Sequence, residues 1–499
     1  RSGPGPRAGL PFRDIWTGTG IPKDMTASSR ILGILNDYCG WRQHAMVSYP
    51  VEDHPFVDSD YIINSPLSYA QDLESNDDKP CTDIDSYRKL RAVPTVSWGS
   101  NHIPKLLKAH VPFVIRGSRL ISTDETKASI KNGGIMPRWG PDHIHKLFGD
   151  RLLDVYESQK RYFRYWKADA HTGPYEFKEP TVRRQMKLKD FFTEVAKRMN
   201  KMGQSLSHNP EEEVKAKSGN KTQKGGDSTF LYLQESLSGH PEMAEEFATW
   251  NWPWLLDIVH THKWGPPDRN IILMGMKGAT TPAHYDEQEN IFCQMRGRKE
   301  VYLWHPSDWR GMYPFPVNHA CDRQAMVNPD APDLVRFPKF RHTRPHYALL
   351  QAGDLLYLPV GWWHHFRIYE HLSVSITFWS KQPKIKLEEL TLPLTERQLI
   401  NVRRNLEEMV MRNSGPRSLL DLNKALNTMD KSSNSGKAVD PRKSRSKTPE
   451  GVLEFMVRCL CNFLPREQAR IYVKEMLEGR YEDDCGSWVQ PKGENMSGW

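Results

Sequence analysis

The sequence predicts a mainly β fold, either a barrel or a sandwich, with helical additions that include a C-terminal set of helices. Short strand-like runs dominate residues 229–380, among them FLYLQ, IILMGM, NIFCQM, KEVYLWHP, DLLYLP and LSVSITFW. Gly/Pro turns separate the runs, and many short strands with little helix between them are typical of these two architectures. After Lys381 the apolar residues change to the spacing of amphipathic helices.

Capping and apolar spacing predict the C-terminal helices. Thr395 and Gln398 form a capping-box pattern, which marks the start of a helix. Three apolar stripes follow at helical spacing: Leu399, Val402, Leu406, Met409 and Val410; Leu419, Leu422, Leu426 and Met429; and Leu453, Met456, Leu460 and Phe463. Helices placed after a completed barrel serve as a core within the same chain or as an oligomer contact, so a homodimer through them is one hypothesis.

Composition and patterning divide the rest of the chain. HVPFVIRG at 110–117 predicts a buried strand, WGPDHIHKLFGD predicts a helix that Gly149 ends, and the proline-rich connection 305–351 predicts irregular structure. The predicted segments are a loosely ordered N-terminal extension (1–90), the N-terminal part of the catalytic domain (91–204), a disordered insertion (205–228), the catalytic core (229–380), C-terminal helices (381–430), a basic linker (431–450), and further helices and a tail (451–499).

Charge and cysteine content exclude several classes of protein. The 499 residues carry a net charge of +8, and no apolar run approaches the roughly 18 residues that a membrane span requires. Seven cysteines without a CxxC pair argue against a disulfide scaffold or a zinc ribbon. The chain begins at Arg1 with no apolar leader, which is consistent with a fragment and with a cytoplasmic or nuclear location.

His284 and Asp286 are the first candidate metal ligands. They stand two residues apart in a strand-like run, so both side chains point to the same face, with Asn290, Phe292 and Gln294 continuing that face. GWWHHF supplies a third ligand from a distant strand, either His364 or His365. Two histidines and one carboxylate make the facial triad of non-haem Fe(II) oxygenases; the alternative is a set of ordinary barrel histidines.

Lys299 is a candidate anion-binding residue. Alternation along KEVYLW places it on the face of Val301 and Leu303. If that face is the interior, the buried lysine needs an anionic partner, and the dicarboxylate 2-oxoglutarate would provide one. The alternative is a lysine that reaches solvent at a strand end. Tyr232 and Gln234 share one face of FLYLQ and could line the same cavity, although a buried tyrosine with a satisfied hydroxyl is equally ordinary.

Several sequence blocks occur together in order: TPAHYDEQENIFCQMRGRKE, YPFPV, CDRQ, RFPKF, GDLLYLP and WWHHF. In these blocks, over roughly residues 93–430, the chain resembles the JmjC-type 2-oxoglutarate oxygenases, and is most similar to asparaginyl hydroxylases of the kind that inhibit hypoxia-inducible factor. The resemblance implies a double-stranded β-helix, the cupin or JmjC jelly roll. It also implies Fe(II) as cofactor, with 2-oxoglutarate and O₂ as co-substrates.

The same resemblance assigns roles to individual residues. It implies that His284, Asp286 and His364 bind Fe(II), whereas His365 packs behind them. The implied co-substrate residues are Lys299, Thr281, Tyr232, Asn290 and Thr377. The implied substrate residues are Arg323 and Gln324 of CDRQ, Gln234, Tyr165 and Trp379. Close relatives have Asn-Phe-Trp where this chain has Thr377-Phe378-Trp379, so one polar contact beside the iron is altered.

The activity implied by the resemblance is hydroxylation of an asparagine β-carbon in an extended protein segment, such as an ankyrin repeat or a transcription-factor tail in hypoxia signalling. One alternative is a JmjC lysyl hydroxylase, demethylase or RNA hydroxylase, against which CDRQ argues. Another is an inactive cupin that serves as a binding scaffold, against which the complete ligand set argues. Nucleic acid is a weak candidate partner, because part of the basic excess lies in PRKSRSK at 441–447, a solvated linker.

Overall fold

The computed structural model describes residues 91–121, 139–167, 177–206, 229–240, 242–370, 372–381, 394–431 and 448–482. The predicted N-terminal extension, residues 207–228 of the predicted insertion and residues 432–447 of the predicted linker lie outside these ranges. No helix within these ranges combines the length and the hydrophobicity needed to cross a lipid bilayer.

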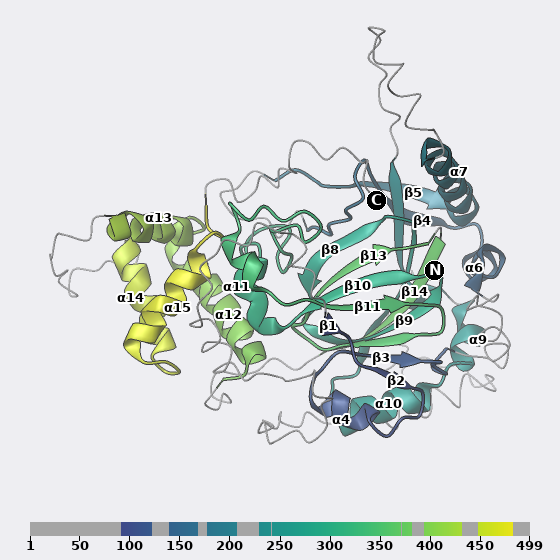
Figure 1. Cartoon of the computed structure of the whole chain (residues 1–499), viewed down its shortest axis with the longest axis horizontal. Coiled ribbons are helices and arrows are strands. Elements are labelled where there is room, and N and C mark those ends of the chain that lie inside the picture. Colours follow the sequence, from purple (N-terminus) through teal and green to yellow (C-terminus); the bar gives the residue numbers. More distant parts are fainter. Residues whose placement is uncertain are drawn as a thin grey trace, which may run out of the picture.

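Two β-sheets form the body of the described chain (Figure 1). The small sheet has the strand order β1-β11-β10-β13-β8, with β1 at Arg91–Ala92, β11 at His346–Leu350, β10 at Lys299–Trp304, β13 at Trp363–Ile368 and β8 at Thr280–Tyr285. The large sheet has the order β2-β3-β12-β9-β14-β7-β6-β4-β5. Its strands are β2 Thr95–Ser97, β3 Phe113–Arg116, β12 Leu355–Leu358, β9 Gln288–Arg296, β14 Leu372–Lys381, β7 Pro267–Met276, β6 Phe230–Ser236, β4 Leu152–Ser158 and β5 Val182–Lys187.

The chain passes repeatedly between the two sheets from β7 to β14. Strands β7, β9, β12 and β14 lie in the large sheet, whereas β8, β10, β11 and β13 lie in the small sheet. This alternation of antiparallel strands between two facing sheets is the double-stranded β-helix, so the predicted fold class is confirmed.

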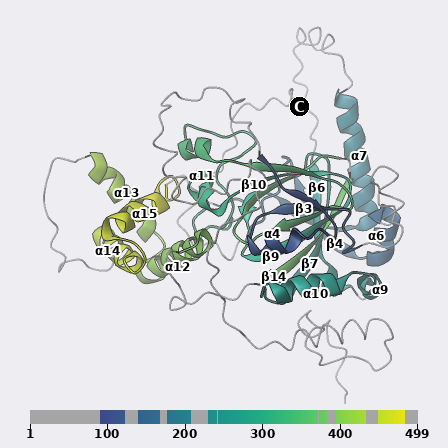
Figure 2. The ribbon, with the colours of Figure 1, turned by 60° about the horizontal axis from the view of Figure 1, so that its bottom comes forward.

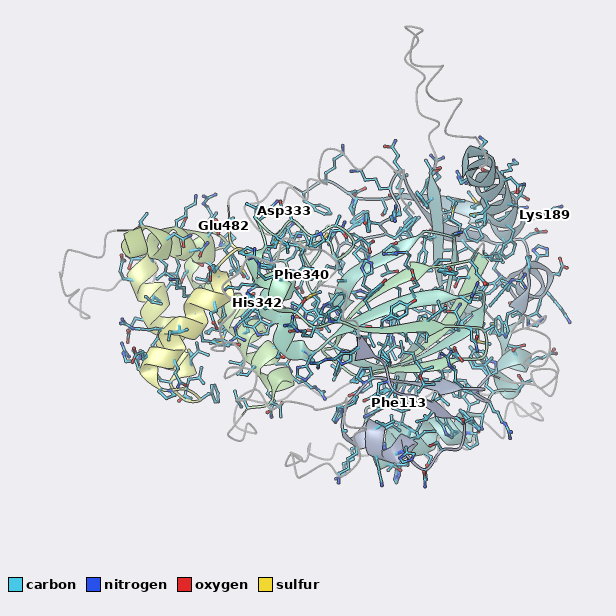
Figure 3. The ribbon with its side chains drawn as sticks, viewed as in Figure 1. Phe113, Lys189, Asp333, Phe340, His342 and Glu482 are labelled. Carbon is cyan, nitrogen blue, oxygen red and sulfur yellow. The ribbon has the colours of Figure 1, made fainter. Side chains whose placement is uncertain are left out.

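Side-chain alternation divides the apolar residues of the sheets into two cores. The barrel interior is a small cluster in which Phe292 and Leu356 of the large sheet meet Val301 and Phe366 of the small sheet. Val301 and Leu303 therefore face the interior, which fulfils the condition on which the anion-binding role of Lys299 depended. The other face of the large sheet belongs to a larger cluster that includes Phe113, labelled in Figure 3 near the helices at the lower edge.

Helices cover the outer face of the large sheet and its end. Helices α4 (Ile103–Lys108) and α10 (Trp252–Thr261) lie along one side, and α6 (Pro141–Phe148), α7 (Leu188–Leu206) and α9 (Met243–Ala248) lie toward the β4–β5 end (Figures 1 and 2). A 3-10 turn at Leu237–Gly239 follows β6. Helix α6 ends at Gly149, as predicted, because that residue takes a positive φ of 63°.

The predicted irregular connection 305–351 is too long, because His346–Leu350 forms strand β11. From His305 to Pro345 the chain is irregular, as predicted, and contains only short helical pieces. These are a 3-10 turn at Pro306–Asp308, α11 at Trp309–Met312 and a second 3-10 turn at Pro338–His342. Phe340 of the last turn is buried in a cluster shared with the outward-facing Trp304 and Trp363 of the small sheet. In Figure 3 it lies between the sheets and the C-terminal helices.

The C-terminal helices complete that cluster. Helix α12 (Glu396–Ser414) begins with the predicted capping box, in which Gln398 N–H donates to Thr395 Oγ1 and Thr395 N–H donates to Gln398 Oε1. Helices α13 (Ser418–Lys431), α14 (Pro449–Leu460) and α15 (Arg466–Leu477) follow, and α12 lies between them and the sheets (Figure 2). Most of their apolar residues pack with residues of the sheet and the proline-rich connection, so these helices form a core within the same chain. Met409 of the first predicted stripe is instead 45% exposed.

Candidate metal and co-substrate site

Two histidines and one aspartate converge at one end of the barrel. His284 lies at the end of β8, Asp286 follows that strand, and His364 lies directly opposite His284 on β13. Asp286 Oδ1 is 4.0 Å from His284 Nε2, and Asp286 Oδ2 is 3.7 Å from His364 Nε2. One ligand atom from each residue lies within 4.8 Å of the others, which is the spacing of a shared cation site.

Backbone hydrogen bonds orient the two imidazole rings toward this point. His284 Nδ1–H donates to the carbonyl oxygen of Pro282 at 2.9 Å, and His364 Nδ1–H donates to that of Trp362 at 3.0 Å. With Nδ1 protonated, each Nε2 presents its lone pair to the shared point. Burial, followed by the neighbouring His364, lowers the pKa of His284 to about 3, and burial also lowers the pKa of His364. Both rings are therefore neutral and able to bind a metal ion at neutral pH.

His365 is excluded from the metal site by strand alternation. It points to the opposite face of β13, where its Nε2 lies 3.3 Å from Asp330 Oδ1 and its side chain is fully buried. Asp330 also contacts Arg367 and accepts a hydrogen bond from Tyr162 Oη at 3.0 Å. His365 thus belongs to a structural network behind the sheet, as the resemblance implied.

A β-bulge brings Thr281 to the face that carries His284. Thr281 and His284 are three residues apart and would lie on opposite faces of a regular strand. In the ladder, however, His364 pairs with His284 and Phe366 pairs with Thr281, so β8 has one extra residue between the pairs. Thr281 consequently points inward with Phe366, a residue of the barrel interior.

Lys299, Tyr232 and Thr281 gather inside the barrel. Lys299 Nζ lies 5.2 Å from the centroid of Phe292 and 5.9 Å from that of Tyr232, and the Tyr232 hydroxyl hydrogen-bonds to Thr281. The lysine is 1% exposed, and no carboxylate within the described ranges pairs with it. Burial lowers its pKa to about 7. A buried ammonium that lies beside two aromatic rings, with no carboxylate partner among the described residues, is a receptor for an anion.

Gly275 makes the close approach of Tyr232 possible. A Cβ atom at Gly275 would lie 2.6 Å from Tyr232 Cδ2 and 2.7 Å from Ile368 Cδ1. The sequence analysis did not single out this glycine, although a glycine inside a strand is a known signal of a close approach.

Asn290 and Thr377 also lie at buried positions on the strands that line the interior. Asn290 pairs with Leu358 and Trp379, and its Oδ1 is buried with no hydrogen-bond partner among the described residues. Thr377 lies opposite the inward-facing Phe292, and its Oγ1 donates to the carbonyl oxygen of Ile271 at 3.4 Å. The Asn290 amide is thus available to a ligand, whereas Thr377 retains one backbone contact.

Three of the predicted substrate residues lie beside the metal ligands. The backbone of Gln324 forms a bridge with His284, and the Tyr165 ring contacts the His284 ring edge to face at 5.5 Å between centroids. The Arg323 guanidinium lies 5.9 Å from the Tyr165 ring centroid. Gln324 Nε2 donates to the carbonyl oxygen of Tyr165 at 2.5 Å, so part of its hydrogen-bonding capacity serves the protein itself.

Gln234 and Trp379 lie farther along the interior strands. Gln234 is half-buried on β6, on the face of Tyr232 and opposite Leu273. Trp379 is half-buried on β14 opposite Asn290, and its indole Nε1 is buried with no hydrogen-bond partner among the described residues. All the predicted site residues are therefore on or beside the strands of the barrel.

Sequence reasoning missed one charged residue beside the site. Arg404 of α12 pairs with Asp322 and Glu287, which are neighbours of Arg323 and Asp286. An arginine in an amphipathic helix carries no local signal of such a contact, because its partners are about 80 and 120 residues away along the chain.

Comparisons with known proteins agree with this geometry. Residues 105–384, more than half of the chain, match the cupin-like domain family. The chain is 34% identical over 142 residues to human HSPB1-associated protein 1, which covers 27% of this chain and 28% of that protein. It is 38% identical over 110 residues to Jumonji C domain-containing protein 5 of Drosophila melanogaster (21% and 26%). It is 35% identical over 105 residues to lysine-specific demethylase 8 of Danio rerio (21% and 25%). The matches thus span about a quarter of these relatives.

Proposed function

This chain belongs to the cupin-like domain family, and on that premise we propose that it is an Fe(II)- and 2-oxoglutarate-dependent oxygenase. One observation carries the proposal: the His284–Asp286–His364 triad and the unpaired Lys299 lie in the same barrel. A metal site alone would serve many reactions. A metal site together with a buried cation for a dicarboxylate fits a co-substrate that binds by both of its ends.

The residues of the chain have distinct tasks in such a reaction. The two Nε2 atoms and an Asp286 oxygen would hold Fe(II), a donor set that leaves coordination positions open for co-substrates. When bound, the iron and 2-oxoglutarate supply the oxidative chemistry that inserts one oxygen atom from O₂ into a C–H bond. Lys299 would bind the distal carboxylate of 2-oxoglutarate, and the hydroxyls of Tyr232 and Thr281 would orient it.

The apolar wall around this pocket would keep water out. Phe292 stacks on Phe366 with 4.7 Å between ring centroids, and both side chains belong to the barrel interior. Low polarity strengthens the attraction between the Lys299 ammonium and a carboxylate. It also protects a reactive centre from side reactions.

Within this class we propose a protein substrate and hydroxylation of an asparagine side chain. Gln324 is bridged to His284 through its backbone, and Arg323 precedes it in the same turn. The Arg323 guanidinium offers fixed donors to the oxygen of a primary amide, whereas the buried Gln324 side chain already donates to Tyr165 and accepts from Arg164. The proposed substrate is an extended segment, such as one from an ankyrin repeat or a transcription factor, because its side chain must reach a metal at the end of a barrel.

A lysyl reaction is the second candidate, and the relatives favour it. One of the matched proteins is named a lysine-specific demethylase. Glu287, half-exposed beside the site, adds no support, because it already pairs with Arg404 at 3.2 Å. The experiment below separates the two candidates.

The test is turnover of 2-oxoglutarate by the Fe(II)-loaded protein with matched peptides that contain Asn, Lys or methyl-lysine at one position. Mass spectrometry would show the gain of one oxygen atom or the loss of a methyl group. Asp286→Ala is the control and should abolish turnover with every peptide. If the wild-type protein binds Fe(II) but neither consumes 2-oxoglutarate nor modifies any peptide, a binding scaffold becomes the better description.

A further inference from the structure

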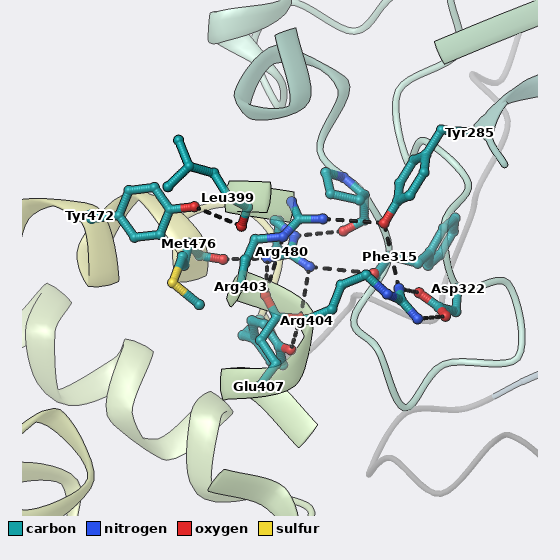
Figure 4. Close-up of polar contacts among 12 residues, drawn as sticks. Tyr285, Phe315, Asp322, Leu399, Arg403, Arg404, Glu407, Tyr472, Met476 and Arg480 are labelled. Carbon is teal, nitrogen blue, oxygen red and sulfur yellow. Dashed lines mark hydrogen bonds and ion pairs between the residues drawn. The ribbon is translucent and has the colours of Figure 1, made fainter. Parts of the chain in front are cut away.

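The guanidinium of Arg404 on helix α12 lies between Asp322 and Glu287, two residues that border the candidate site. Figure 4 shows its hydrogen bonds to Asp322 and Tyr285. Arg404 Nη1 and Nη2 donate to the two carboxylate oxygens of Asp322 at 2.6 and 2.8 Å. The Nε atom of the same side chain lies 3.2 Å from Glu287 Oε1. Such a bidentate arginine–carboxylate pair holds both position and orientation.

The two carboxylates are adjacent in sequence to residues of the site. Glu287 follows the metal ligand Asp286, and Asp322 precedes Arg323, the residue proposed to contact substrate. Tyr285 N–H donates to the carbonyl oxygen of Arg323 at 3.2 Å, so the two turns also touch through their backbones. Arg404 therefore joins the turn of a metal ligand to the turn of a substrate residue.

The substrate-side turn needs external support. Arg323 has a φ of +67°, in the left-handed region that only a few per cent of non-glycine residues adopt. Tyr165 Oη donates to the carbonyl oxygen of Asp322 at 3.1 Å and holds the turn from the barrel side. Arg404 holds it from the helix side, through two hydrogen bonds to the Asp322 carboxylate.

The helix that carries Arg404 is itself firmly anchored. Arg480, which follows α15, donates to Glu407 Oε1 at 2.7 Å and to the carbonyl oxygen of Pro314 at 2.7 Å. Glu407 is fully buried and also accepts a hydrogen bond from Tyr481 at 3.0 Å. This buried network fixes α12 against the connection that leads into the Arg323 turn. Arg404 therefore has a fixed position relative to that turn.

We propose that Arg404 is a positioning residue that holds the Arg323 turn at a set distance from the Asp286 turn, which makes the C-terminal helices part of the catalytic unit. The proposal rests on the proposed function for the role of Arg323 toward substrate. The restraint of the Arg323 and Asp286 turns by the Arg404 guanidinium does not depend on which substrate is modified.

The test compares four variants. Arg404→Met keeps the aliphatic stem of the side chain and removes the charge. Arg404→Lys keeps the charge but cannot form the bidentate hydrogen bonds, and Asp322→Asn removes the negative charge with which Arg404 pairs. Arg412→Met is the matched control, because Arg412 lies on the same helix and is 78% exposed, and its ion-pair partner in the described part of the chain is Glu408 at 3.3 Å. Hydrogen exchange of peptides spanning 318–326, 284–290 and the β10 strand is measured by mass spectrometry, together with Mn(II) binding.

The expected result is selective loosening of the turns. In Arg404→Met and Asp322→Asn, exchange in 318–326 should accelerate about tenfold or more, as for loss of a charge-assisted pair. The β10 peptide and Mn(II) affinity should stay within about twofold of wild type, and Arg404→Lys should be intermediate. Arg412→Met should match wild type. Equal exchange in Arg404→Met and Arg412→Met would overturn the proposal, as would loosening of β10 to the same extent as the turn.

Kinetics distinguish this proposal from the proposed function. If wild type modifies a peptide, Arg404→Met should raise KM for that peptide while 2-oxoglutarate affinity is unchanged, because only the substrate side is released. If wild type neither consumes 2-oxoglutarate nor modifies any peptide but the exchange pattern is as expected, the oxygenase proposal fails and the positioning role stands. If wild type is active and KM does not change in Arg404→Met, the positioning role fails alone.

Discussion

Replacement of Lys299 by methionine should stabilise the protein while it abolishes co-substrate binding. Lys299 is 1% exposed, and burial lowers its pKa from 10.5 to about 7. At about 1.4 kcal/mol per pKa unit, this shift corresponds to an upper bound of about 5 kcal/mol for the cost of keeping the ammonium charged in the interior. Methionine has a similar length and no charge, so Lys299→Met removes that cost and leaves the packing against Phe292 and Tyr232 largely intact.

The pH dependence of this effect follows from the direction of the shift. Because the folded-state pKa lies below the unfolded value, the destabilisation is fully present below pH 7 and disappears as the pH rises toward 10.5. The gain in unfolding free energy from Lys299→Met should therefore be larger at pH 6 than at pH 9. We expect a gain of about 2 to 5 kcal/mol at pH 6, since relaxation of the interior reduces the upper bound.

Urea denaturation of the metal-free protein at the two pH values measures the stability, and calorimetric titration of the Mn(II)-loaded protein measures 2-oxoglutarate affinity. Lys197→Met is the control, because Lys197 is 64% exposed and pairs with Glu194 on the surface of α7. It should change neither quantity appreciably. A Lys299→Met protein that is less stable at pH 6, or that binds 2-oxoglutarate as wild type does, would refute the reasoning.

Three further predictions concern the same pocket. In the wild-type protein, the affinity for 2-oxoglutarate should fall as the pH rises above about 7, by up to tenfold per pH unit, because Lys299 must take up a proton to pair with the carboxylate. Titration calorimetry in buffers of different ionisation enthalpy should detect that proton uptake. Gly275→Ala should displace Tyr232, destabilise the protein by about 1 to 3 kcal/mol and weaken 2-oxoglutarate binding. Urea denaturation measures the stability and calorimetry measures the affinity. An unchanged affinity for 2-oxoglutarate would contradict the assigned role of Tyr232. His364→Ala should lower Mn(II) affinity at least about 100-fold, whereas His365→Ala should lower stability and leave Mn(II) affinity within about tenfold of wild type. An equal loss of Mn(II) affinity in both variants would contradict the ligand assignment.

Much of the fold and of the site could be predicted because short-range periodicity carries the information. The two-residue repeat of a strand places His284 and Asp286 on one face and Lys299 on the face of Val301. The structure brings His284 and Asp286 together and turns the face of Val301 inward. The capping box at Thr395 is equally local and is confirmed. The roles of the co-substrate and substrate residues stay proposals that rest on family resemblance and on their placement.

The remaining features depend on which distant segments pair. From the residues alone His364 and His365 were equivalent candidates for the third metal ligand. The register of β13 against β8 places His364 opposite His284 and so identifies it as the candidate ligand. In a regular strand the Thr281 side chain would point away from the cavity that His284 faces. The β-bulge in β8 turns it toward the cavity. Arg404 reaches the site only because α12 packs beside the Asp286 turn.

The sequence by itself determined the strand pattern, the metal-binding residue types and the face that Lys299 shares with Val301, since each depends on neighbours within a few residues. Only the tertiary structure decided the third ligand, the orientation of Thr281 and the link from the C-terminal helices to the site. The physical reason is that register, bulges and long-range ion pairs arise from packing between segments about 80 to 120 residues apart, and no local repeat encodes such packing.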